Sequence, residues 1–82
     1  MKIDGVSIIE YNVELLRDLN RWSMIDTAEK LGVSIEEYYK LETDAKKAHL
    51  ITLFKVAAFY SVPVSMLMSG KLDAAKLNSK RA

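Results

Sequence analysis

The 82-residue chain has no cysteine, one proline, three glycines and no long run of hydrophobic residues. Without cysteine, neither a disulfide nor a thiolate-bound metal can stabilise the fold. The scarcity of proline and glycine argues against a turn-rich β protein and favours helices. No apolar run approaches the roughly 20 residues that cross a bilayer, and the first residues lack the apolar segment of a signal peptide. These absences predict one small helical domain, which we expect to be cytoplasmic and without membrane contact.

Charge of either sign is nearly balanced, with 12 Lys and Arg against 11 Asp and Glu and a net charge of +1. A dedicated nucleic-acid binder is usually more basic. The distribution is uneven, because residues 1–48 carry 7 basic and 10 acidic side chains, whereas residues 49–82 carry 5 basic and 1 acidic. We therefore divide the chain into a domain over residues 1–70 and a basic tail, residues 71–82, that is either disordered or associated with a dimer.

Hydrophobic residues make up 50% of the chain and recur at helical spacing. The first segment begins near Ser7, a candidate N-cap, and Pro63 suits the start of the last. In the fourth segment we expect an inward face of Leu50, Leu53, Ala57 and Tyr60, with Phe54 and Val56 beside it. The five predicted helices cover residues 7–22, 24–31, 35–42, 49–60 and 64–68.

Two short predicted helices between Ser23 and Glu42 are joined by a turn that contains Gly32. Ser23 is a good N-cap for the first, and Ser34 with Glu37 three residues later forms a capping box for the second. The small Ala28 suits a helix crossing, the glycine tolerates a left-handed backbone, and Val33 can fill the turn. Tyr38 and Leu41 point inward by spacing. This arrangement is typical of a helix-turn-helix.

The chain shows one extended resemblance, carried by Arg17, the run Ala28–Ser34 (AEKLGVS), Glu42 and the apolar run 53–62. In this order they resemble the Cro/repressor-type (Xre-like) helix-turn-helix family of phage and bacterial transcription regulators, from about Val13 to Leu67. The resemblance implies an all-α, five-helix lambda-repressor-like DNA-binding domain. It also implies that Arg17 and Glu42 form a structural ion pair, so Glu42 is not expected to be catalytic.

The resemblance also assigns residues to DNA contact, because in this family the third helix enters the major groove and helix N-termini meet phosphates. A glutamate there can accept from cytosine N4 and an isoleucine can pack on a thymine methyl, but two adjacent acids repel phosphate. Tyr39 and the loop lysines are also compatible with plain solvated surface. The positions assigned to DNA are Ser23, Met24, Ser34, Ile35, Glu36, Glu37, Tyr39, Lys40, Lys46 and Lys47.

Two functions of different class remain open. The first is a repressor or Cro-like regulator that binds double-stranded DNA as a homodimer, for which Val64, Met66 and Met68 offer an exposed apolar surface. The second is a modulator or antirepressor that binds another regulatory protein through the acidic pair Glu36 and Glu37 and does not bind DNA. A toxin–antitoxin or restriction-control regulator of the same fold would bind DNA in the same way as the first and differ only in its biological role.

The sequence contains no arrangement typical of an enzyme. It shows no nucleophile with a neighbouring base and no glycine-rich loop for phosphate. His49, the single histidine, lacks the companions that a metal site needs. We therefore expect neither enzymatic activity nor a cofactor.

Overall fold

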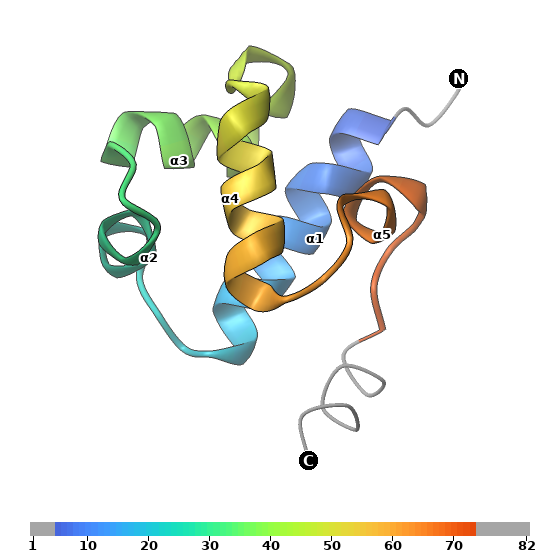
Figure 1. The fold of residues 1–82 in the computed structure, drawn as a ribbon, viewed down its shortest axis with the longest axis horizontal. Coiled ribbons are helices and arrows are strands. Elements are labelled where there is room, and N and C mark those ends of the chain that lie inside the picture. The colour runs from blue at the N-terminus through green and yellow to red at the C-terminus, as the bar shows by residue number, and fades with distance from the viewer. Residues whose placement is uncertain (1–4, 74–82) are drawn as a thin grey trace.

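The computed structural model describes residues 5–73, and every regular element in that range is helical (Figure 1). Figure 1 shows α2 and α3 on one side of the molecule and α5 on the other. The five predicted helices are all present, so the predicted fold class is confirmed. The elements are α1 (Gly5–Leu19), α2 (Met24–Leu31), α3 (Ile35–Thr43), a 3₁₀ helix η1 (Ala45–Lys47), α4 (Leu50–Tyr60) and α5 (Val64–Ser69).

The ends of α2 and α3 follow from local hydrogen bonds. The hydroxyl of Ser23 accepts from the Asp26 N–H at 3.0 Å, and the hydroxyl of Ser34 accepts from the Glu37 N–H at 3.0 Å. Each serine thereby satisfies one of the free N–H groups in the first turn of a helix. Gly32 ends α2 at φ 75°, a left-handed conformation that glycine adopts without steric cost. The expectation for Ser7 was wrong, because α1 already begins at Gly5.

The core is formed by inward faces of all five α-helices, and α1 packs against both α3 and α5. A side chain of α1, Val13, and one of α5, Leu67, have no exposed surface. Such burial is worth about 1.5–3 kcal/mol for each large apolar side chain. The buried hydrophobic residues are Ile9, Val13, Leu16, Ala28, Leu31, Tyr38, Leu41, Leu53, Val56, Ala57 and Leu67.

The inward face of α4 differs from the prediction. Leu50 is 61% exposed, whereas Thr52, which the periodicity did not place inward, is buried. Leu53 and Ala57 are buried as predicted, and the Thr52 hydroxyl has a partner inside the fold, donating to Glu37 at 2.8 Å. A buried polar group with a hydrogen bond costs little. The apolar Leu50 and Phe54, by contrast, lie on the outer surface.

A buried amide on α1 holds the C-terminal side of the fold. The Asn12 Nδ2 donates to the carbonyls of Leu67 and Gly70 at 3.0 and 2.9 Å, and its Oδ1 accepts from the Leu72 N–H at 2.8 Å. Asn12 has no exposed surface, and Leu72 packs against the core. The packed chain therefore continues to Leu72, past the predicted boundary at residue 70. Most of the predicted tail, residues 74–82, lies outside the described residues.

Among the described helices, none is both long and apolar enough to cross a membrane.

The replacement Asn12→Ala is expected to lower the free energy of unfolding by about 2–4 kcal/mol, because it leaves two carbonyls and one N–H without a partner. Denaturant titration followed by circular dichroism measures the change. Asn20→Ala is the matched control, since Asn20 makes one local bond to the Leu16 carbonyl and its loss should cost less than about 1 kcal/mol. Equal effects of the two variants would contradict the role given to Asn12.

Candidate nucleic-acid interface

The two helices α2 and α3 form the helix-turn-helix that the sequence predicts. Ala28 is 1% exposed within the core, so a larger side chain could not be accommodated there without displacing its neighbours. The Val33 N–H donates to the Ala28 carbonyl at 3.0 Å, and Val33 packs against the core. Because the turn is closed by this bond and by Gly32, the start of α3 is fixed relative to α2.

The inner face of α3 is anchored to α1 by an ion pair. Arg17 Nε and Nη2 donate to the two Glu42 carboxylate oxygens at 2.6 and 3.1 Å, and the two side chains are only 14% and 2% exposed. The Tyr38 hydroxyl donates to the same carboxylate. The hydrogen bond to Glu42 raises the pKa of Arg17, and burial followed by the Glu42 bond raises the pKa of Tyr38. At neutral pH Arg17 therefore stays protonated and Tyr38 stays neutral, so both can donate to the Glu42 carboxylate.

Trp22 covers the same anchor from the side of the first loop. Its ring lies 6.3 Å from that of Tyr60 in a stacked arrangement and 5.7 Å from that of Phe59. The Trp22 carbonyl accepts from Arg17 at 2.9 Å, and the Lys30 Nζ lies 4.9 Å from the indole centroid. Burial raises the pKa of Tyr60 to about 12, so this ring stays neutral beside the ion pair.

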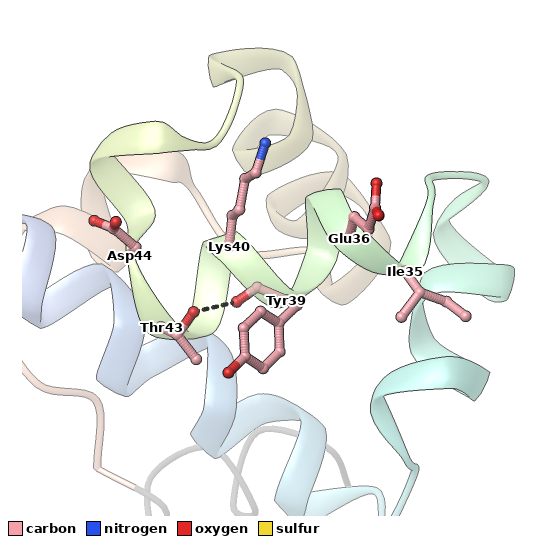
Figure 2. A pocket seen from close by; sticks show the side chains of 6 residues that line it. All are labelled: Ile35, Glu36, Tyr39, Lys40, Thr43 and Asp44. Carbon is pink, nitrogen blue, oxygen red and sulfur yellow. Dashed lines mark hydrogen bonds between the residues drawn. The ribbon is translucent and has the colours of Figure 1, made fainter.

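The outer face of α3 is open to solvent (Figure 2). Ile35 and Tyr39 are 49% and 54% exposed, and Glu36 and Lys40 are also exposed. These four residues line one open depression together with Thr43 and Asp44. Ser34 is exposed at the start of the helix, where its hydroxyl serves as the N-cap. A rigid helix with a buried inner face and this exposed outer face has the form needed to enter a groove.

Glu37 does not share this outward face with Glu36. Its Oε2 accepts from the His49 N–H at 2.5 Å and from the Thr52 hydroxyl at 2.8 Å. The carboxylate thus caps the N-terminus of α4, where an acid is favoured by the helix dipole. Partial desolvation raises its pKa, but these two hydrogen bonds together with the nearby charge of Lys40 lower it, and the net shift is downward. The structure therefore gives Glu37 a structural contact that the sequence analysis did not assign.

The loop after α3 is fastened at both ends by carboxylates. Glu10 of α1 accepts from the Ala45 N–H at 2.8 Å, at the start of η1, and Glu37 holds the His49 N–H beyond its end. Lys46 and Lys47 lie between these two attachments and are exposed. Lys47 lies 3.6 Å from Asp44, an exposed pair that contributes little to stability. The loop therefore presents two lysines from a fixed backbone.

The two residues at the start of α2 that were predicted to contact DNA differ in their exposure to solvent. Ser23 is exposed, whereas the Met24 side chain is partly buried and packs against the core. A phosphate at this helix end would therefore meet the Ser23 hydroxyl and the backbone N–H of Met24, with no contribution from the Met24 side chain.

The residues predicted to form a dimer contact also differ in their exposure to solvent. Met68 is 45% exposed, but Val64 is partly buried and packs against the core, as does Leu72. The expectation of an exposed Val64 was wrong, because this side chain packs against the core, and Met66 is also only partly exposed.

A family model described as helix-turn-helix matches residues 13–67, which is most of the chain. The chain belongs to this family, the Cro/repressor type of DNA-binding regulators. No curated protein and no solved structure matches the chain. The matched range contains α2, α3, the loop lysines and α4, and both partners of the ion pair.

The structural acids Glu10 and Glu37 and the amide of Asn12 were missed at the sequence level. Their partners are 12 to 60 residues away in the chain, and periodicity within one helix carries no information on such contacts. Thr52 was the one available signal, because a single polar residue on an otherwise apolar helix face indicates a partner inside the fold.

The replacement Glu37→Gln is expected to destabilise the protein at neutral pH and to lose this effect in acid. A carboxylate whose pKa is lowered by folding stabilises fully above its unfolded pKa, about 4.3, and loses this contribution as the pH falls through the folded pKa. The difference in unfolding free energy between the native chain and Glu37→Gln should therefore shrink below about pH 4. Urea titrations between pH 7 and pH 3 measure it.

The control variant is Glu14→Gln, which removes an equal charge from an exposed acid of α1 and so separates the cap from the change in net charge. The difference in unfolding free energy between the native chain and Glu37→Gln could instead stay constant across this pH range. That result would show that the carboxylate charge does not stabilise α4.

Proposed function

We propose that the protein is a transcription regulator of the repressor or Cro-like kind, which reads operator DNA by inserting α3 into the major groove. The observation that carries this proposal is the exposed face of Ile35, Glu36, Tyr39 and Lys40 on a helix whose other side is held by Tyr38 and Glu42. Base readout requires side chains held rigidly at a protruding edge, and this helix supplies them.

Phosphate contacts surround that edge. Lys46 and Lys47 extend from the fastened loop, and the exposed Ser23 stands at the start of α2. Each lysine that neutralises a phosphate releases counterions, so binding should weaken steeply with salt. The engagement of Glu37 with α4 supports the proposal, because it leaves Glu36 as the one exposed acid of α3 where the sequence suggested two.

The alternative is a protein-interaction module, a modulator or antirepressor that binds another regulatory protein through the outer face of α3. The exposed Ile35 and Tyr39 favour it, because apolar and aromatic side chains are common in protein interfaces. Its original basis, two adjacent acids, is weaker now that Glu37 caps α4. This alternative predicts no affinity for DNA even at low salt.

The regulator is proposed to act as a homodimer through an apolar surface on α4 and α5, which we define as Leu50, Ile51, Phe54 and Met68. These side chains are 45–61% exposed, and Leu50 and Met68 line the same small pocket. A helix as apolar as α4 is normally covered on all sides. Two copies joined here could present their α3 helices to half-sites about 34 Å apart on one face of DNA.

The double variant Lys46→Ala/Lys47→Ala is expected to weaken binding to every duplex and to lower the slope of log K against log salt by about 2. Fluorescence anisotropy at several salt concentrations measures both quantities. The control is Lys71→Ala, which removes a lysine that follows α5 in the chain and lies 4.8 Å from the centroid of the Tyr11 ring on α1. If the native chain shows no salt-dependent binding to any duplex, the DNA proposal is wrong and the protein-interaction alternative is favoured.

The variant Ile51→Asp is expected to shift the protein from dimer to monomer in sedimentation equilibrium, because it buries a charge in the proposed contact. Ile25→Asp is the matched control, since Ile25 and Ile51 are both 59% exposed and both lie in the first turn of a helix. An acid in that turn favours the helix, so both variants should fold. A native chain that sediments as a monomer at high concentration would contradict the dimer.

A further inference from the structure

The exposed side chains of α3 form two parallel rows (Figure 2). Glu36 and Lys40 lie on one side of the helix axis, and Ile35, Tyr39 and Thr43 lie on the other. Within each row the members are four residues apart, so they are neighbours along the helix surface. The Thr43 hydroxyl donates to the Tyr39 carbonyl at 2.8 Å. Among the exposed side chains of α3, the charged groups are therefore confined to the row of Glu36 and Lys40.

The two members of this charged row have opposite hydrogen-bonding chemistry. An ionised glutamate only accepts, and a lysine only donates. In the major groove, cytosine presents the N4 amine as a donor with no acceptor beside it on the same base, whereas adenine presents its N6 amine next to the acceptor N7. A carboxylate is repelled by that N7. The guanine paired with cytosine presents O6 and N7, two acceptors suited to a lysine.

We propose that Glu36 and Lys40 together read one C·G base pair in each half-site, with Glu36 accepting from cytosine N4 and Lys40 donating to the guanine. This inference rests on the proposed function, namely insertion of α3 into the major groove. Glu36 is repelled by the phosphates of every sequence and gains a hydrogen bond only where a cytosine amine faces it. The acid therefore lowers non-specific affinity and raises the ratio of specific to non-specific binding.

The test begins by selecting duplexes that the native chain binds from a random pool, followed by anisotropy titrations with each base pair of the half-site varied in turn. The native chain is expected to prefer cytosine at one position by about 10-fold or more, which is the range of a good base contact. In Glu36→Gln the preference at that position should move to adenine, because glutamine pairs with N6 and N7, and non-specific binding should become tighter.

Two further variants make the outcome specific. Glu14→Gln changes the net charge by the same amount on α1 and should keep the preference for cytosine. Lys40→Ala should reduce discrimination at the same base pair, and a uniform loss at all sequences would overturn the role given to Lys40. Binding with an unchanged base preference in Glu36→Gln overturns the inference alone. Absence of any salt-dependent DNA binding by the native chain overturns the proposed function with it.

Discussion

The carboxylate of Glu42 is the group on which the orientation of α3 depends. It receives Arg17 from α1 through two hydrogen bonds and the hydroxyl of Tyr38 from its own helix. A charge that is 2% exposed is tolerated only with such partners. Because Arg17 also donates to the Trp22 carbonyl, one guanidinium connects α1, the first loop and the end of α3. The outer face of α3 is therefore held in one direction relative to the rest of the fold.

Three of the acidic side chains have structural roles within the fold. Residues 1–48 are acidic by count, yet Glu10, Glu37 and Glu42 accept hydrogen bonds from other elements of the structure. Glu10 and Glu37 hold the backbone of the loop that carries Lys46 and Lys47. Two acidic side chains therefore help to position two lysines. These bonds leave the formal net charge at +1, but they hold the backbone from which Lys46 and Lys47 are exposed to solvent.

Local chemistry explains what could be predicted. The caps at Ser23 and Ser34 and the left-handed Gly32 depend on residues within four positions of each other, and the helices they bound were predicted to within about a turn. Helical periodicity could not identify Glu37 as the partner of the buried Thr52, since the pairing spans 15 residues. The same holds for Asn12, whose three partners lie beyond residue 66. In the candidate site, helical periodicity predicted the exposed face of α3. It did not predict that Glu37 would bond to α4 while Glu36 stays exposed.

In the proposed complex, the outer face of α3 is the surface that meets DNA. The most direct measurement is the map of backbone amide chemical shifts as a selected duplex is titrated into the labelled protein. The account predicts the largest changes at residues 23–25, 34–40 and 44–47, with little change at residues 12–16 of α1. Large changes confined to α4 and α5, with α3 unaffected, would contradict it.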